Sequence, residues 1–172
     1  MSAEKLVVPR RSLLYMPGAN ARALEKAQAI DCDTIIFDLE DAVASAAKTQ
    51  AREQVETALA QHQYGYRELV VRCNALETEW GLGDLRTFAR APVSALLFPK
   101  IENAAQIQHI KRELALLGSS LPVWIMIETP TAVLNLQQFA DDAAVTCLVI
   151  GTSGLVQELS PKHLPSRSNI DD

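Results

Sequence analysis

The stretch "TIIFDLEDAV", residues 34–43, joins a short apolar run to a group of acids. Residues 34–37 have the composition of a strand, and Asp38, Glu40 and Asp41 follow almost at once. Continuous apolarity over so short a run is typical of a strand that is covered on both faces, as in a parallel sheet. The stretch therefore predicts a buried strand that ends in a polar site.

The rest of the chain repeats this pattern of apolar runs alternating with helical segments. Further runs of strand length lie at residues 12–16, 68–72, 94–98, 123–127 and 147–150. Segments with helical spacing separate them, at residues 20–30, 46–62, 81–90, 103–118 and 131–142. This alternation predicts an α/β fold with a parallel sheet and right-handed crossovers.

These βα units are compatible with an open doubly wound sheet or with part of a (β/α) barrel, and periodicity alone does not separate the two. A dinucleotide-binding open sheet favours a glycine-rich phosphate loop after an early strand, but the sequence contains neither G-x-G-x-x-G nor a Walker motif. Turn residues agree with the division into elements. Residues suited to begin or end helices and strands are Pro17–Gly18, Asn20, Asn103, Gly118 and Pro130.

Composition and charge predict one globular domain over residues 1–172. With 48% hydrophobic residues, the chain has enough apolar side chains for one compact core. The net charge of -5, without a block of Lys and Arg, argues against nucleic acid as a partner. No apolar run approaches the roughly 20 residues of a membrane span, and the N-terminus lacks an apolar signal core. We therefore expect a cytoplasmic protein without a membrane partner.

The cysteines and histidines are not predicted to carry chemistry. The cysteines are odd in number and widely spaced in apolar segments, unlike a disulfide framework or a zinc site, so packing positions are expected for Cys32, Cys73 and Cys147. The histidines lie in polar surroundings, so surface positions rather than roles as bases are expected for His62, His109 and His163.

Polar side chains follow the predicted strands at their carboxyl ends. In a parallel α/β fold these ends lie on one side of the sheet, so the side chains are predicted to converge on one pocket. The residues concerned are Asp38, Glu40, Asp41, Arg72, Asn74, Lys100, Glu102, Glu128, Thr152 and Ser153.

Arg72 and Glu128 each allow a functional and a structural interpretation. Glu128 either binds a divalent cation or a substrate hydroxyl, or is a carboxylate stabilised at the N-terminal end of a helix. Arg72 either clamps a substrate carboxylate or forms a buried ion pair with Asp38 or Glu40, and the two roles are compatible. A hard cation held mainly by Glu128 would have oxygen ligands, which suit Mg²⁺ or Mn²⁺. Such an ion polarises a carbonyl and stabilises an enolate.

Six segments of the chain occur in an order and spacing that match a known family: "RSLLYMPGANARALEKA", "DTIIFDLEDAV", "VVRCNAL", "ALLFPKIENAAQI", "WIMIETPTAVLN" and "CLVIGTSGL". In these segments the chain resembles the HpcH/HpaI aldolase and citrate lyase beta-subunit family, which includes malyl-coenzyme A lyase. The resemblance implies a TIM-type barrel, here incomplete with about six βα units. It also implies a Mg²⁺-dependent carbon–carbon lyase that acts on a citryl-CoA-like or malyl-CoA-like acyl thioester, giving an oxo acid plus an acetyl thioester.

The resemblance further implies roles for individual residues. Arg72 would grip the oxo acid, and Glu128 would ligate the metal and contact the substrate. Asp38 and Glu40 would line the pocket and orient metal-bound water. The residues placed near the thioester carrier, a coenzyme A or acyl-carrier arm, are Pro17, Gly18 and Lys100.

The sequence departs from the family pattern in two ways. The family typically has an aspartate after the sixth strand as a second metal ligand; here Gly154 stands there, which should weaken a Mg²⁺ site, and Glu158 is the nearest replacement through water. An eightfold barrel usually needs about 250 residues, so an incomplete barrel with edge strands that demand a partner, and hence a homo-oligomer, is expected. The alternative function is a catalytically degenerate ligand-binding or oligomer-forming module, or a truncated inactive fragment.

Overall fold

The computed structural model describes residues 9–61 and 63–159. In this part of the chain, six parallel strands form one sheet in the order of the sequence. The strands are β1 (Leu13–Pro17), β2 (Thr34–Asp38), β3 (Glu68–Arg72), β4 (Ala95–Phe98), β5 (Val123–Ile127) and β6 (Val145–Ile150). The helices are α1 (Ala21–Ala27), the 3₁₀ turn η1 (Ser45–Ala47), α2 (Lys48–Ala60), α3 (Gly81–Phe88), α4 (Ala104–Leu116), α5 (Pro130–Leu134), α6 (Leu136–Ala140) and α7 (Thr152–Leu159).

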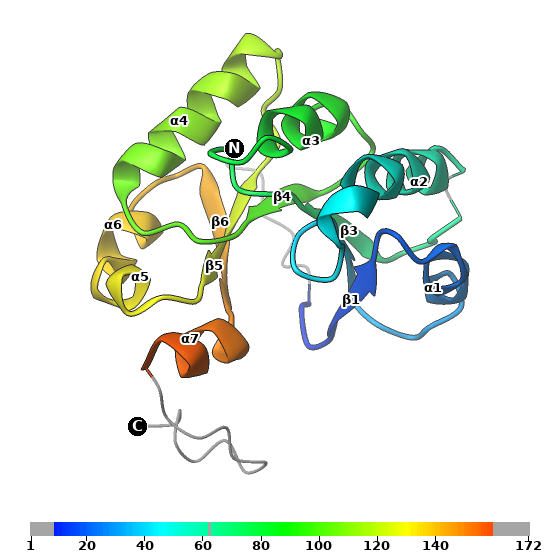
Figure 1. Cartoon of the computed structure of the whole chain (residues 1–172), viewed down its shortest axis with the longest axis horizontal. Helices are drawn as coiled ribbons and strands as arrows, with labels where there is room; N and C mark the ends of the chain where they lie inside the picture. The colour runs from blue at the N-terminus through cyan, green and yellow to red at the C-terminus, as the bar shows by residue number, and fades with distance from the viewer. Residues whose placement is uncertain (1–8, 62, 160–172) are drawn as a thin grey trace, which may run out of the picture.

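The sheet does not close on itself. β1 and β6 stand at its two edges, and each pairs with one neighbour among the described strands. Figure 1 shows the helices arranged in an arc around the outer side of the strands, with the arc open between β1 and β6. The fold is therefore an incomplete barrel of the TIM type, and the prediction of an α/β fold with about six βα units is confirmed.

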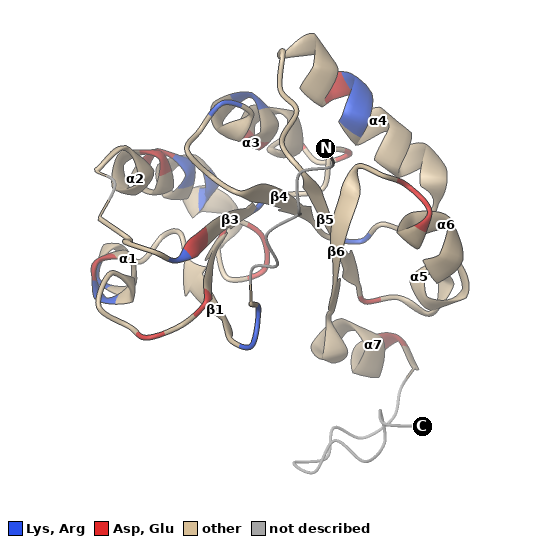
Figure 2. Ribbon diagram, turned by 180° about the vertical axis from the view of Figure 1, so that it is seen from behind, with Lys and Arg blue, Asp and Glu red and all other residues tan. Residues whose placement is uncertain are grey.

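Both faces of the central strands are covered, because successive side chains point to opposite faces of a sheet. On the outer face, strand residues pack against the helices in the main core, among them Ile35, Phe37, Val71, Leu96 and Ile125. On the inner face a smaller cluster consists of Ile36, Val70, Ala95, Leu97, Trp124 and Met126. β2, β4 and β5 are buried along their whole length, which explains their continuous apolarity. In Figure 2 the charged positions accordingly gather on helices, loops and strand ends.

The predicted helix boundaries at Asn20, Asn103, Gly118 and Pro130 are confirmed. The Asn20 side chain accepts a hydrogen bond at the start of α1, and Asn103 forms a reciprocal capping box with Gln106 at the start of α4. Gly118 follows α4 with a φ of 68°, a left-handed conformation that glycine adopts without steric cost. Pro130 lies in the first turn of α5, where a missing N–H is tolerated.

Most elements differ from the predicted ranges by a few residues at their ends, and the last third of the chain also differs in the number of its helices. The single helix expected over residues 131–142 is two short helices, because the chain leaves helical geometry at Asn135, whose side-chain amide donates to the carbonyl of Glu102 at 2.8 Å. β6 begins at Val145, two residues before the expected strand. Helix α7 was not predicted, since Gly154 lowers the helix propensity of its first turn.

The packing positions predicted for the cysteines are confirmed, and the position of one histidine is compatible with the predicted surface location. Cys32 and Cys73 are buried free thiols, and Cys147 packs partly buried against the inner cluster. His109 is partly exposed on α4, with 41% of its side chain accessible, and lies 3.7 Å from a carboxylate oxygen of Glu113. His62 and His163 lie outside the described residues. None of the helices in residues 9–61 and 63–159 has the length and apolarity of a membrane span.

Candidate functional site

The alternation of the strands aims Asp38, Arg72 and Glu128 toward the inner side of the arc. Each stands two residues after a member of the inner cluster, namely Ile36, Val70 and Met126. The parallel register also sets Asp38 directly opposite Arg72. The convergence of these polar residues thus follows from strand period and strand pairing.

Arg72 is buried among carboxylates. Its Nε and Nη2 donate to the two oxygens of Asp38 at 2.8 and 2.5 Å, while Nη1 lies 3.0 Å from Glu40 and 3.4 Å from Asp41. Burial alone would lower the pKa of Arg72, but the hydrogen bond and charge of Asp38 outweigh it and the pKa is raised. Arg72 is therefore a fixed cation whose Asp41 contact is the longest and, with that side chain 64% exposed, the most accessible.

The loop after β2 is held by its own acids and by Lys48. Asp38 Oδ1 accepts from the Glu40 N–H at 2.8 Å, and Glu40 Oε2 accepts from the Asp41 N–H at 3.0 Å. The buried Lys48 ammonium donates to the carbonyls of Leu39 and Glu40 at 2.7 Å each. Burial lowers the pKa of Lys48, and nearby acids, Glu40 first, oppose this. Side chains thus satisfy both N–H and carbonyl groups of this turn, which fixes its conformation.

Glu128 is 6% exposed at the end of β5. Its Oε1 accepts the main-chain N–H of Lys100 at 2.7 Å. Burial raises the pKa of Glu128, and the Lys100 N–H acts in the opposite direction. Oε2 lies against the loop after β6, 3.1 Å from where a Cβ would stand on Gly151 and 3.5 Å from where one would stand on Gly154.

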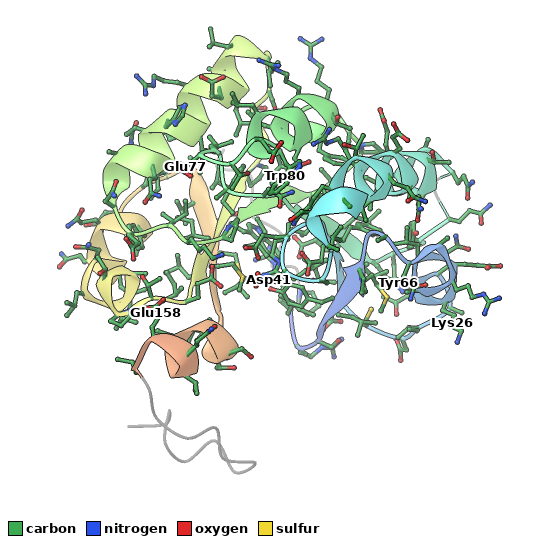
Figure 3. The ribbon with its side chains drawn as sticks, viewed as in Figure 1. Lys26, Asp41, Tyr66, Glu77, Trp80 and Glu158 are labelled. Atoms are coloured by element: carbon green, nitrogen blue, oxygen red, sulfur yellow. The ribbon has the colours of Figure 1, made fainter. Side chains whose placement is uncertain are left out.

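Arg72 and Glu128 line the same open cavity of about 510 Å³ at the carboxyl ends of the strands. Figure 3 shows Asp41, which also lines it, close to the strand ends near the middle of the molecule. The other lining residues are Tyr15, Asp38, Ala42, Met126, Val149, Ile150, Gly151, Thr152, Ser153 and Gly154. Another cavity of about 510 Å³ is lined mainly by residues of α1 and α2, and it shares no lining residue with the cavity of Arg72 and Glu128.

A smaller cavity of about 300 Å³ adjoins the cavity of Arg72 and Glu128, and Asp41 lines both. Glu40 and Lys100 line this smaller cavity, and the Lys100 ammonium lies 3.1 Å from Glu40 Oε1. The expected single pocket is therefore two neighbouring cavities, with Arg72, Glu128 and Asp38 on one and Glu40 and Lys100 on the other, while Glu102 lines neither.

Pro17 and Gly18 line neither of these two cavities. Gly18 is buried, and its N–H donates to the carbonyl of Asp38 at 2.8 Å. A Cβ on Gly18 would lie 2.9 Å from the Leu39 side chain and 3.0 Å from the Asp38 carbonyl. Close packing of β1 against the loop after β2 therefore requires glycine here.

The described residues supply a limited set of metal ligands. They contain no group of three or more His, Cys, Asp and Glu side chains arranged to hold a metal ion. Glu158 is exposed on α7 and does not line the cavity. Mg²⁺ is often held by one or two carboxylates, with water and substrate oxygens completing its shell. Glu128 Oε2 fits that ion as a single carboxylate ligand, and Gly154 adds none.

Tyr15 and Lys48 belong to the site but were not singled out in the sequence. The guanidinium carbon of Arg72 lies 5.3 Å from the Tyr15 ring centre, and the Tyr15 hydroxyl donates to Met126 Sδ at 3.3 Å. Burial raises the pKa of Tyr15 to about 12. Strand alternation was a usable signal for Tyr15, since it places this residue on the face of Asp38. Lys48 had no such signal, because its partners are main-chain carbonyls.

Comparison with known proteins agrees with this fold. Residues 11–170 match the HpcH/HpaI aldolase/citrate lyase family, and the chain belongs to it. A (3S)-malyl-CoA thioesterase of Cereibacter sphaeroides is 45% identical over 159 residues, which are 92% of this chain and 54% of that protein. The citrate lyase subunit beta of Escherichia coli is 30% identical over 169 residues, 94% of this chain and 56% of that protein.

Solved structures similar to this chain include citrate lyase beta subunits. The citrate lyase beta subunit of M. tuberculosis, complexed with oxaloacetate and magnesium, matches with a TM-score of 0.71 and 26% identity, over 88% of this chain and 62% of that chain. The M. tuberculosis protein CitE in complex with magnesium, acetoacetate and coenzyme A matches with the same TM-score and identity, over 88% of this chain and 52% of that one. This chain spans about half the length of the malyl-CoA thioesterase and citrate lyase relatives it matches.

Proposed function

We propose that this chain is a carbon–carbon lyase of the aldol or Claisen type, acting on a citryl-CoA-like or malyl-CoA-like acyl thioester. The observation that carries the proposal is the shared cavity of Arg72 and Glu128, a fixed cation and a buried carboxylate at the strand ends. Family membership supports it, as do relatives named for malyl-CoA and citrate chemistry.

Arg72 would bind the carboxylate of the oxo-acid part of the substrate in exchange for one of its present carboxylate partners. Nη1 holds Glu40 at 3.0 Å and the exposed Asp41 at 3.4 Å, so an incoming carboxylate displaces Asp41 at little cost in buried ion pairs. Asp38 keeps both of its oxygens on Nε and Nη2, which fixes the plane of the guanidinium. Tyr15 supports the guanidinium through its ring.

Glu128 Oε2 would hold Mg²⁺ or Mn²⁺ together with the oxygens of the bound oxo acid. When bound, such an ion polarises the oxo-acid carbonyl and stabilises negative charge that develops on oxygen. Glu128 would also exclude a competing anion from its side of the cavity. The thioester carrier would extend outside the cavity toward Pro17, at the carboxyl end of β1.

The reaction breaks the bond between the carbinol carbon and the carbon next to the thioester carbonyl. The hydroxyl proton leaves, the carbinol becomes the carbonyl of the oxo acid, and the bonding electron pair goes to the thioester fragment. Protonation of that fragment then gives the acetyl thioester. No oxidant or reductant is required.

The test is product analysis after incubation with malyl-CoA or citryl-CoA and Mg²⁺. The lyase predicts equal amounts of acetyl-CoA and of glyoxylate or oxaloacetate. Glu128→Gln should reduce this turnover by more than about a hundredfold, since it removes the metal-binding charge. Glu158→Gln, the same change on the exposed surface of α7, serves as the matched control and should leave turnover unchanged.

Two other results would overturn the lyase. Free CoA with intact malate or citrate would indicate hydrolysis of the thioester, the reaction named for the Cereibacter relative. Binding of the oxo acid without any product would indicate the second candidate function, a ligand-binding module that has lost catalysis. Gly154, which adds no carboxylate beside Glu128, is the observation that favours this second candidate.

A further inference from the structure

We infer that Lys100 is a positioning residue that acts through its main chain, by holding Glu128 in the orientation that leaves Oε2 open to the cavity. The expected effect on ligand binding rests on the proposed function. The backbone conformation of Lys100 and its hydrogen bond to Glu128 do not depend on it. Lys100 was expected to lie near the thioester carrier, whereas the role inferred here belongs to its main-chain N–H.

The backbone of Lys100 is the first observation. Its φ is 54°, and among the described residues it is the one non-glycine residue with positive φ. The left-handed region is disfavoured for a residue with a Cβ, and such conformations persist where surrounding contacts over-determine them. Lys100 therefore occupies a conformation that some local contact compensates.

The compensating contact is the hydrogen bond to Glu128. The Lys100 N–H donates to Glu128 Oε1 at 2.7 Å, and the carboxylate is 6% exposed. A charge-assisted hydrogen bond to a buried carboxylate is strong, and losing it leaves the acceptor unsatisfied. This bond commits Oε1 and thereby turns Oε2 toward Gly151 and Gly154 at the cavity wall.

Lys100 makes two contacts with acids, and the ion pair of its ammonium with Glu40 is weaker than the hydrogen bond of its N–H to Glu128. Its side chain is 59% exposed and lies 3.1 Å from Glu40 Oε1, a partner that also contacts Arg72. Exposed ion pairs contribute little because water and salt screen them. Geometry thus assigns the positioning role to the N–H of Lys100 rather than to its charge.

The test compares three uncharged replacements that differ in backbone preference. Lys100→Gly and Lys100→Asn tolerate positive φ, whereas Lys100→Val does not. All three lose the ammonium. The inference predicts that Val weakens Mg²⁺-dependent oxaloacetate binding, measured by calorimetry, about tenfold more than Gly or Asn does. Equal losses for all three would assign the role to the ammonium and overturn the inference.

A second measurement does not depend on ligand binding. The Tm difference between the Lys100→Gly and Lys100→Val proteins is measured with Glu128 present and in the Glu128→Ala background. If the carboxylate holds the backbone, this difference shrinks by at least about half without it, because residue 100 is then free to leave the left-handed region. An unchanged difference would overturn the inference even if oxaloacetate does not bind.

The folding of Lys100→Val is itself a risk for both measurements. Lys100→Ala then takes its place, since alanine also disfavours positive φ but lacks the branched Cβ. Absence of oxaloacetate binding in the wild-type protein would refute the proposed function alone, and the Tm comparison would still decide the role of the Lys100 backbone.

Discussion

Arg72 shows how a buried cation can be both structural and available to a ligand. Three of its nitrogens hold carboxylates, and two of those carboxylates, from Asp38 and Glu40, are themselves buried. Removing the guanidinium would leave buried negative charge without a partner, which is costly. Only Asp41 is exposed, so ligand exchange at Nη1 is the change that leaves the buried pairs intact.

Gly154 offers a direct prediction about the metal. A Cβ at this position would lie 3.0 Å from the Cβ and the carbonyl oxygen of Glu128, so small shifts admit a side chain beside that carboxylate. Gly154→Asp should tighten Mg²⁺ binding on the order of tenfold, equivalent to about 1.4 kcal/mol, because Mg²⁺ affinity follows ligand charge. Calorimetric titration with Mg²⁺ measures it.

Gly154→Asn is the matched control, since it adds nearly the same volume without charge. It should leave Mg²⁺ binding at the wild-type level. Equal gains for both variants would attribute the change to a more rigid start of α7, and no gain for Asp would mean that its carboxylate does not reach the ion beside Glu128.

The convergence of Asp38, Arg72 and Glu128 could be predicted from the sequence, because it follows from a rule about parallel strands. The contacts of Lys48 and Lys100 could not, since they depend on where individual main-chain carbonyl and N–H groups lie in loops. The same limit applies to Gly18, expected near a thioester carrier and found buried against Leu39.

At the scale of elements, ion pairs fasten the strands at both ends. At the carboxyl ends, Arg72 joins β3 to Asp38 of β2. At the amino ends, Arg11 precedes β1 and pairs with Asp33 before β2, with its N–H and side chain all donating to that carboxylate. Ion pairs thus stabilise the strand pairing at both ends of the apolar segments.

The Arg11–Asp33 pair predicts a pH-dependent contribution to stability. Hydrogen bonds from Arg11 lower the pKa of Asp33 to about 2, from 3.8. A depressed folded-state pKa adds stability above the unfolded value, which is lost as the pH falls toward 2. Asp33→Asn should therefore lower the urea midpoint at pH 6, and its gap from the wild type should close between pH 4 and 2.

Arg11→Gln provides the comparison for that prediction. It removes the partner instead of the acid, so it should show the same closing gap. A gap of constant size from pH 6 to pH 2 would mean that the pair does not contribute to the acid sensitivity of the fold.

Most element types could be predicted from the sequence, whereas the break between α5 and α6 could not. The six strands carry uninterrupted apolar runs, which local composition reveals. The break between α5 and α6 depends on a hydrogen bond from Asn135 to Glu102, 33 residues away in sequence. Such a long-range contact leaves no mark in helical periodicity.

At the scale of the molecule, the sheet is an arc whose site is built from its middle and both of its edge strands. β2 and β5 are buried throughout, while β6 at the edge has Ile150 65% exposed. Arg72, Glu128 and the loop after β6 nevertheless meet in one cavity. The described residues therefore contain both groups that the proposed oxo-acid site requires.

Titration of oxaloacetate in the presence of Mg²⁺, into the wild type and into Arg72→Lys, tests this central claim most directly. Lysine keeps the charge beside Asp38 but lacks the planar fork of the guanidinium. We predict binding by the wild type and about ten- to a hundredfold weaker binding by the variant, the range expected for hydrogen bonds to a charged group. No binding heat from the wild type, or equal affinity for both proteins, would contradict the account.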